Sequence, residues 1–363
     1  MSKTKTYVII GCGMMGREHM RNIALVDGAE LVAIADPDAG SRDQAKALAD
    51  TLAQMPRMFA DNAEMLAEAK PDAVIVASPN FTHFDIVQPI METGCAVLLE
   101  KPMCTQIEDA KALARAEREY GNLFWVGLEY RYMPPVTRFI ERVHAGEAGD
   151  IKMLAIREHR FPFLEKVGDW NRFNRNTGGT LVEKCCHFFD LMRHILRDEP
   201  VRVFASGAQD VNHLDERYDD ETPDIIDNAF VMVDFAGGAR ATLDLCMFAE
   251  GSEQQEEISA VGPFGKMEVK LPRGEVTWSP RDKSGPFVSH VETPPDALAA
   301  GDHHGATYFQ LRDFHAALIN GTDPLIDARD GYRSVVMGAA AQQSIATGQP
   351  VDIQFSDKDV EHA

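Results

Sequence analysis

Hydrophobic and polar positions follow two different patterns along the chain. Up to residue 124, short apolar runs typical of buried strands are separated by segments whose apolar residues recur at helical spacing. The strand-like runs lie at 7–13, 30–38, 71–80, 95–102 and 122–130, and the helical segments at 14–26, 39–53, 82–94 and 107–121. This alternation predicts a parallel sheet with helices on both faces, an α/β arrangement.

The second half of the chain is dominated by longer strand-like runs with short turns between them. They lie at 151–160, 201–209, 226–236, 239–249, 256–271 and 275–280. Strands that follow one another directly favour antiparallel pairing, so we expect an open, mostly antiparallel sheet with few helices, an α+β arrangement. Residues 209–227 hold eight acids and one arginine, which predicts a solvated loop. The expected domains are therefore 1–124 and 125–363.

Composition and charge narrow the possible functions. The chain has 363 residues, of which 45% are hydrophobic, enough for two packed cores. It has no run of about 18 apolar residues and no signal-peptide pattern, so we expect a cytoplasmic protein that does not span a membrane. The net charge of −21 repels phosphate backbones and anionic lipids, which argues against nucleic-acid and membrane partners. The six cysteines form no CxxC pair, which is typical of reduced, buried thiols.

The sequence GCGMMG at residues 11–16 indicates a dinucleotide-binding turn. It follows the first strand and opens the first helix, which is the required context. Gly11 allows the tight turn, Gly13 lets the backbone approach a pyrophosphate, and Gly16 lets the helix pack closely on the strand. Met14 and Met15 begin the helix, whose N–H groups and positive dipole end face the phosphates. The alternative is an ordinary strand–helix turn.

Asp36 indicates which dinucleotide binds. It ends the second strand, where an acid hydrogen-bonds the ribose hydroxyls and repels a 2′-phosphate, so NAD is favoured over NADP. Arg42 is near enough in sequence to accommodate such a phosphate and argues the other way. The alternative for Asp36 is a simple turn residue before Pro37.

The segment GGTLVEKCCHFFD at residues 178–190 brings a carboxylate, an ammonium, two thiols and an imidazole together. Its glycine pair leads into a helical pattern that suits a metal site, a nucleophile or a proton relay. Adjacent cysteines cannot both face one pocket, and no third ligand cluster is present, so we expect no metal. Glu183 and His187 are four residues apart and share one face of a helix. Taken alone, His187 is better explained as a core histidine with its hydrogen bonds satisfied.

These features together resemble the glucose–fructose oxidoreductase / inositol dehydrogenase family, Gfo/Idh/MocA. The resemblance rests on the glycine turn, the sequence EKP at 100–102 after a strand, and the glycine pair followed by Glu183 and His187. It extends from the first strand to about residue 355. It implies a Rossmann domain with NAD, followed by an α+β domain that binds the substrate and forms the oligomer.

The family also implies roles for individual residues. Glu100, Lys101 and Pro102 would lie at the cofactor, with Lys101 reaching the substrate beside the nicotinamide and the proline peptide often cis. Glu183 stands where the family usually has aspartate, four residues before its histidine. Tyr130 and Arg131 match the stretch that the family presents to the pocket.

The chemistry of these residue types agrees with those roles. A histidine such as His187 can take the proton of a secondary hydroxyl near neutral pH. The Lys101 ammonium can donate to the developing alkoxide, and Glu183 can orient His187 or hold a neighbouring hydroxyl.

Residues 151–175 form a basic island, with six lysines and arginines against three acids. The island leads directly into the segment that carries His187, so we expect part of it to border the substrate. The substrate-binding candidates outside the motifs are Arg157, Arg160, Trp170, Arg172 and, before a C-terminal helix, His304. Such a cluster suits an anionic sugar. The alternative is that these arginines pair with the protein's own acids.

The predicted function is therefore an NAD-dependent oxidoreductase that oxidises a secondary hydroxyl of a sugar, cyclitol or sugar derivative. One alternative is an NAD-dependent glycoside hydrolase, which would oxidise, eliminate, hydrate and re-reduce its substrate. A second alternative is an NAD-sensing protein without catalysis. The open sheet predicts a homodimer or homotetramer.

Overall fold

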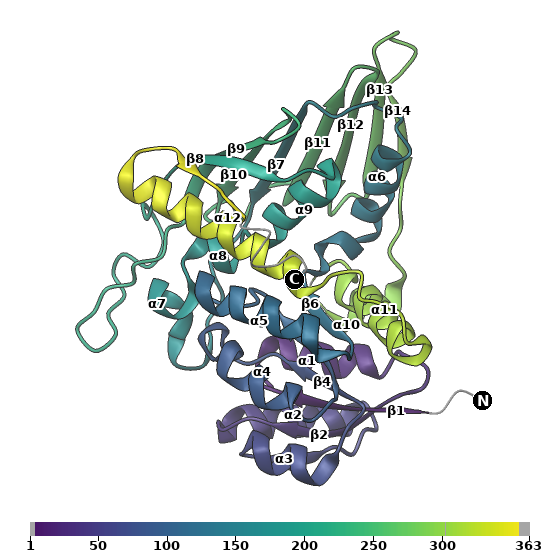
Figure 1. Ribbon diagram of the computed structural model, residues 1–363, viewed down its shortest axis with the longest axis vertical. Coiled ribbons are helices and arrows are strands. Elements are labelled where there is room, and N and C mark those ends of the chain that lie inside the picture. The colour runs from purple at the N-terminus through teal and green to yellow at the C-terminus, as the bar shows by residue number, and fades with distance from the viewer. Residues whose placement is uncertain (1–3, 302, 356–363) are drawn as a thin grey trace. The chain divides into compact units, whose positions relative to one another are not determined.

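The computed structural model describes residues 4–301 and 303–355 and divides into two compact units (Figure 1). The first unit comprises residues 4–132 and 294–332, and the second comprises 133–293 and 333–355. The expected single boundary at 124/125 differs from this division in two ways. The boundary falls after Tyr132, and the chain later returns to the first unit.

The first unit contains a parallel sheet of six strands in the order β3-β2-β1-β4-β5-β6, which confirms the predicted α/β arrangement. Strands β4 and β5 are buried along their whole length, so their sequences are continuous apolar runs without alternation. The strands are β1 (Lys5–Ile10), β2 (Ala29–Ala35), β3 (Arg57–Phe59), β4 (Ala73–Val76), β5 (Ala96–Glu100) and β6 (Phe124–Gly127).

Helices connect these strands and follow them in sequence. Asp38 and Asp61 cap the helices that begin after them, each accepting a hydrogen bond from a main-chain N–H three residues on. The α-helices are α1 (Met14–Ile23), α2 (Ala39–Thr51), α3 (Asn62–Ala69), α4 (His83–Met91) and α5 (Ile107–Tyr120). Two 3₁₀ turns, η1 (Asn80–Thr82) and η2 (Glu129–Tyr132), follow β4 and β6.

The returning segment adds two helices to the first unit, α10 (Pro295–Ala300) and α11 (Ala306–Asn320). Helix α11 packs against α1 and η2. The buried Tyr7 hydroxyl lies 2.7 Å from Nδ1 of His315 on α11, which ties the returning segment to β1. The helix after residue 301 was predicted, but its packing on the first domain was not.

The second unit contains a nine-stranded sheet in the order β14-β13-β12-β11-β7-β10-β9-β8-β15. Among the described strands of this sheet, only β7 and β10 pair in parallel, so the prediction of an open, mostly antiparallel sheet is confirmed. The run predicted at 256–271 is a hairpin, β11 and β12, because Pro263 and Phe264 turn the chain. The strands are β7 (Met153–His159), β8 (Pro200–Ala208), β9 (Asn228–Phe235), β10 (Arg240–Cys246), β11 (Glu256–Gly262), β12 (Gly265–Leu271), β13 (Glu275–Pro280), β14 (Phe287–His290) and β15 (Val351–Asp352).

The second unit has more helix than the sequence pattern predicted. Helix α12 (Ala328–Thr347) has 20 residues and crosses from the first unit into the second. The others are α6 (Pro134–His144), α7 (Asn174–Thr177), α8 (Thr180–Glu183), α9 (Cys186–Leu196) and the 3₁₀ segment η3 (Val167–Arg172). Burial alternates along β7 and β9, as expected for a sheet with one covered and one open face.

No helix in the described part of the chain is long and apolar enough to cross a membrane.

Candidate active site

The glycine turn between β1 and α1 has the geometry that the motif predicts. Gly11 has φ +87°, and a Cβ there would lie 2.6 Å from the main-chain oxygen of Ala77. A Cβ on Gly16 would collide with the carbonyl oxygen of Gly11, so the helix packs directly on the turn. A Cβ on Gly13 would meet no protein atom within 4 Å. Packing thus requires glycine at positions 11 and 16, while position 13 is open to an approaching ligand.

Asp36 lies beside this turn and is held by the main chain. Its Oδ2 accepts a hydrogen bond from the Cys12 N–H at 2.8 Å, and its Oδ1 accepts one from the Asp38 N–H, also at 2.8 Å. A carboxylate has about four acceptor sites, so these bonds leave capacity for the hydroxyls of a ribose. Arg42 donates to the carbonyl oxygens of Asp36 and Pro37 at 2.7 and 2.9 Å. Its guanidinium is therefore engaged by the main chain.

Together the turn, the start of α1 and Asp36 suit a dinucleotide. Met14 and Met15 form the first turn of α1 and are half-buried, and Gly13 precedes them with an extended backbone. The free N–H groups of that turn can bind phosphate oxygens, and Asp36 can accept from the adenosine ribose. These residues would hold NAD, whose nicotinamide accepts a hydride.

The EKP motif begins at the last residue of β5 in the first unit. Glu100 is buried, and its Oε1 lies 2.7 Å from Nε2 of His19 on α1. Burial alone would raise the pKa of Glu100, but the hydrogen bond from His19 lowers it below its usual range, so the carboxylate stays ionised. The Lys101–Pro102 peptide is cis, as expected. Lys101 itself is half-buried.

Several ionisable side chains surround this motif within the first unit. Glu18 on α1 accepts hydrogen bonds from Nδ1 of His303 at 3.1 Å and from the hydroxyl of Thr307 at 2.6 Å. Glu129 on η2 is fully buried, and burial followed by the charge of Glu100 raises its pKa to about 7. The buried Tyr130 ring lies 6.4 Å from the ring of His303. Sequence reasoning missed Glu18, His19 and Glu129, which carry no motif of their own.

Two substrate candidates of the first unit have different surroundings. The Arg131 guanidinium lies 2.9 Å from the Asp330 carboxylate and donates to the Leu325 carbonyl oxygen at 3.2 Å, so it anchors the start of α12. We do not retain it as a substrate residue. His304 is half-buried with φ 52°, and its role stays a prediction.

In the second unit, the segment after the glycine pair is not one continuous helix. Gly178 and Gly179 have φ values of 77° and 92°, which explains the requirement for glycine. Helix α8 ends at Glu183, a turn covers Lys184 and Cys185, and α9 begins at Cys186. The expectation of a single helical face is thus wrong in detail. Glu183 and His187 are both buried, and the pair's proposed interaction stays a prediction.

The other residues of this segment have structural roles. The Lys184 ammonium lies 2.8 Å from Oε1 of Glu158 on β7, a buried ion pair that sequence reasoning missed. Cys185 and Cys186 are fully buried, and burial followed by the Glu158 charge raises the pKa of Cys185 well above its usual value. Cys185 therefore stays a thiol, which argues against a nucleophile. Within residues 4–301 and 303–355, no group of three or more histidine, cysteine and acidic side chains is placed to hold a metal ion.

The basic island is neutralised by acids of the second unit. Arg172 is buried and lies 3.0 Å from Glu216, and Arg175 pairs with Glu221. Residues 209–227 thus pack on the island and are not simply a solvated loop. Arg160 lies 3.5 Å from Glu158, and its guanidinium stacks on the Phe161 ring. Arg172 and Arg175 have acidic partners of their own, and Arg160 shares Glu158 with Lys184, so most of the charge that motivated an anionic substrate is paired within the protein.

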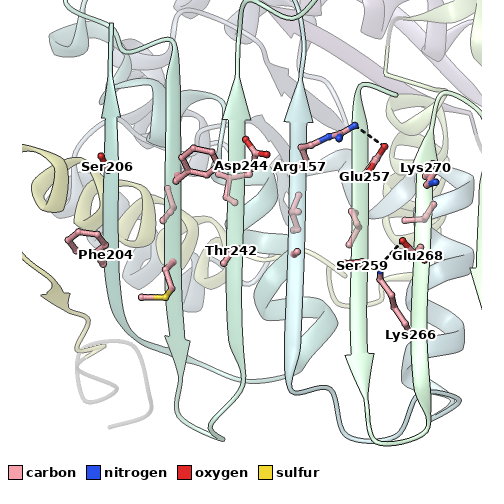
Figure 2. A pocket seen from close by; sticks show the side chains of 18 residues that line it. Arg157, Phe204, Ser206, Thr242, Asp244, Glu257, Ser259, Lys266, Glu268 and Lys270 are labelled. Carbon is pink, nitrogen blue, oxygen red and sulfur yellow. Dashed lines mark hydrogen bonds and ion pairs between the residues drawn. The ribbon is translucent and has the colours of Figure 1, made fainter. Parts of the chain in front are cut away.

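Arg157 points to the face of the sheet opposite Glu158. Side chains alternate along β7, and the Glu158 carboxylate contacts Lys184 between α8 and α9 on the covered face. Arg157 lies on the open face and forms an ion pair with Glu257 at 2.8 Å (Figure 2). We therefore do not retain Arg157 as a substrate residue. Trp170, half-buried on η3, remains a candidate.

Comparisons with known proteins agree with this geometry. Residues 5–128 match a Gfo/Idh/MocA family model described as an oxidoreductase family with an NAD-binding Rossmann fold. Residues 140–353 match the model of that oxidoreductase family's C-terminal alpha/beta domain.

Several curated relatives and solved structures are similar over nearly the full chain. The scyllo-inositol 2-dehydrogenase (NAD(+)) of Bacillus subtilis is 26% identical over 95% of each chain. The myo-inositol 2-dehydrogenase of Thermotoga maritima is 25% identical over 95% of this chain and 98% of its own. A levoglucosan dehydrogenase in complex with NADH has a TM-score of 0.84 at 19% identity, covering 96% of this chain and 99% of that one. At that identity the last comparison shows the fold alone.

Proposed function

Because the chain belongs to the Gfo/Idh/MocA oxidoreductase family, we propose that it is an NAD-dependent dehydrogenase that oxidises a secondary hydroxyl of a cyclitol or sugar. One observation carries this proposal. The first unit combines a turn suited to a dinucleotide with Lys101 directly after the buried Glu100. The names of the inositol dehydrogenase relatives support a cyclitol or sugar as the substrate class.

Lys101 and His187 have complementary roles in this proposal. His187 takes the proton of the substrate hydroxyl, because a neutral imidazole is a competent base near pH 7. The Lys101 ammonium donates a hydrogen bond to the oxygen as it becomes an alkoxide. Glu183 orients His187 or accepts from a neighbouring hydroxyl. Tyr130 and Trp170 contribute aromatic surface to the ring of the substrate.

A panel of substrates tests the proposal. The purified protein is incubated with NAD⁺ and myo-inositol, scyllo-inositol, levoglucosan or glucose, and NADH formation is recorded. We expect NADH in proportion to the polyol consumed for at least one of them. If none of a broad set of free polyols and sugars reduces NAD⁺, the dehydrogenase assignment fails.

The same assay, with a glycoside added to the panel, separates the dehydrogenase from the two alternatives, an NAD-dependent glycosidase and an NAD-sensing protein. An NAD-dependent glycosidase recycles its cofactor, so a glycoside would be cleaved without net NADH. An NAD-sensing protein would bind NAD and convert neither class of compound.

The rates with neutral and with acidic sugars are compared in the same assay. Because the basic island is paired internally, we expect neutral substrates to be turned over at least as well as acidic ones.

We also infer that the open face of the second sheet joins two copies of the chain. It forms a groove of about 540 Å³ lined by strands β7 to β12. Phe230 and Met232 are 69% and 45% exposed on this face, a large apolar surface for a monomer to leave in water. Basic and acidic side chains alternate across it, with Arg157 paired to Glu257 and Lys266 to Glu268 (Figure 2). A second copy offers both the apolar surface and the complementary charges.

A further inference from the structure

His83, the first residue of α4, bridges two segments that follow neighbouring strands of the parallel sheet. Its Nδ1 lies 2.9 Å from the carbonyl oxygen of Pro102, after β5, and its Nε2 lies 3.0 Å from the carbonyl oxygen of Ser78, after β4. The side chain of His83 is fully buried. This histidine therefore joins the segment after β4 to the segment that carries Lys101.

The segment after β4 also lies against the glycine turn that is suited to NAD. A Cβ on Gly11 would come within 2.6 Å of the main-chain oxygen of Ala77 and of the main-chain nitrogen of Ser78. The segment after β4 is therefore packed directly on the turn. Through Ser78 and Pro102, His83 relates the position of the residues after β5 to the position of that turn.

Lys101 stands between two residues that are held by buried histidines. Glu100, before it, has its Oε1 2.7 Å from Nε2 of His19 on α1, and Pro102, after it, is in contact with His83. Helices α1 and α4 thus hold the chain on both sides of the lysine. A side chain on an anchored main chain has fewer positions open to its ammonium group, which favours one fixed geometry.

The two contacts of His83 are not equivalent. A neutral imidazole has one N–H and one lone pair, so it donates to only one of the two carbonyl oxygens. Burial lowers the pKa of His83, against the opposing effect of the hydrogen bonds to Pro102 and Ser78, so the ring is neutral at pH 7. Pro102 is buried, whereas Ser78 is half-buried. Because a buried carbonyl without a donor is the costlier one, the proton belongs on Nδ1, toward Pro102.

We propose that His83 is a positioning residue that holds Lys101 in place by donating a hydrogen bond from Nδ1 to the carbonyl oxygen of Pro102. This inference rests on the proposed function, in which the Lys101 ammonium donates to the reacting oxygen of the substrate. Misplacing such a group by about 1 Å lowers the rate by up to ~100-fold. The competing explanation is that His83 serves only to fasten α4 to the sheet, in which case its two contacts matter equally.

Two substitutions keep different halves of this bridge. The amide nitrogen of asparagine takes the place of Nδ1 and can donate to Pro102, whereas that of glutamine takes the place of Nε2 and can donate only to Ser78. His83→Asn and His83→Gln thus each lose one contact of the same kind. His83→Leu loses both contacts and is a second variant without the bond to Pro102. His315→Asn is the matched control, because it replaces another buried histidine of the first unit, in contact with Tyr7.

Hydrogen–deuterium exchange of the full-length protein without substrate reports on the segment after Lys101. The amides of residues 103–106 are followed by mass spectrometry, and the amides of β1 in the same digest show whether a change is confined to this segment. Exchange of residues 103–106 should be at least about fivefold faster than in the parent for His83→Gln and His83→Leu. It should stay within about twofold of the parent for His83→Asn and His315→Asn.

Steady-state kinetics with the best substrate of the panel tests the link to catalysis. His83→Gln and His83→Leu should lower kcat by about ten- to a hundredfold, with the KM for NAD within about threefold of the parent. His83→Asn should keep kcat within about threefold, because it retains the bond to Pro102. A residue that only fastens α4 would give the asparagine and glutamine variants the same kcat.

Equal exchange of residues 103–106 in His83→Gln and His83→Asn would overturn the inference, and so would equal kcat values in these two variants. If His83→Gln does not fold, His83→Leu takes its place in both comparisons. The exchange measurement needs no turnover, so its result stands apart from the dehydrogenase assay. If no polyol reduces NAD⁺, the proposed function fails, while the exchange rates still decide whether His83 holds the segment of Lys101 through Pro102.

Discussion

Asp36 uses its two carboxylate oxygens to bind the main-chain N–H of Cys12, inside the cofactor turn, and that of Asp38, two residues further along the chain. Its charge should therefore select the dinucleotide. Asp36→Ala should narrow the difference in binding free energy between NAD and NADP by roughly 1–3 kcal/mol, through a lost charge-assisted hydrogen bond and a relieved repulsion. Calorimetric titration of both dinucleotides measures this, with Asp43→Ala as an exposed control. A parent protein that already prefers NADP would refute the assignment.

Lys101 and His187 should dominate the chemical step. Lys101→Ala and His187→Ala should each lower kcat by ~10²–10⁴ while NAD affinity stays nearly constant. Glu183→Gln should be milder, because glutamine keeps most of an orienting hydrogen bond. Steady-state kinetics with the best substrate of the panel provides the test, and Lys46→Ala serves as a matched exposed lysine. Near-normal turnover would remove the substituted residue from the mechanism.

Glu129 should make stability depend on pH near neutrality. Its pKa is about 7 in the folded chain, against an ordinary value of about 4.3. Between these two values the folded state keeps a proton that the unfolded state has lost, so stability falls as the pH rises. Glu129→Gln cannot ionise, and its unfolding free energy relative to the parent should rise from pH 5 to pH 8. A pH-independent difference, as expected for the exposed control Glu119→Gln, would contradict this.

At the residue scale, the sequence predicted what a local motif can encode. Gly11 and Asp36 lie in short patterns whose spacing predicts the turn and the acid beside it, while the role of Lys101 comes from the family resemblance and stays a prediction. The contact between Glu18 and His303 could not be predicted, because the two residues are 285 positions apart in the chain. The sequence pattern drew attention to His304 as a substrate residue, whereas its neighbour His303 makes the contact with Glu18.

At the scale of elements, substitutions in the glycine turn between β1 and α1 should affect folding stability and NAD binding separately. Gly11→Ala should lower the unfolding free energy by more than Gly238→Ala. Both glycines have φ above +80°, but only a Cβ at Gly11 would collide with other main-chain atoms, those of Ala77 and Ser78 after β4. Gly13→Ala should leave stability within a few tenths of a kcal/mol, since its Cβ meets no protein atom. It should nevertheless weaken NAD binding. Urea denaturation and NAD titration of the three variants test this. Unchanged NAD affinity in Gly13→Ala would contradict the proposed approach of the pyrophosphate.

The helices and strands that the hydrophobic pattern did not predict correctly are those in which the pattern is short or interrupted. Strand β3 has three residues, too few for any periodicity to be visible. The 256–271 run looked continuous because both strands of the hairpin are apolar at alternate positions. The break between α8 and α9 falls at Lys184, whose side chain reaches Glu158 on β7. That tertiary ion pair has no local signal.

At the scale of the whole molecule, the open sheet face predicts self-association. Phe230→Glu places a charge at the most exposed aromatic side chain of that face and should convert the oligomer to a smaller species. Phe264→Glu is the control, because Phe264 is 61% exposed on the β11–β12 turn, outside the groove. Light scattering of both variants and the parent measures the mass. A monomeric parent, or equal masses for the parent and Phe230→Glu, would refute this interface.

The two-domain architecture was predictable because strand and helix periods change along the chain. The return of residues 294–332 to the first unit was not, because helix α11 meets α1 and η2 through contacts distant in sequence. That return also brings His303 to Glu18.

The most direct test of the central claim follows the hydrogen on the reacting carbon. The protein is incubated with NAD⁺ and an inositol or sugar from the panel that carries deuterium on its ring carbons, and the cofactor is analysed by mass spectrometry. The account predicts one deuterium in NADH for each ketone formed, with transfer strongly reduced in Lys101→Ala and His187→Ala. Turnover of a polyol or glycoside without deuterium in the cofactor, or no transfer from any panel member, would contradict it.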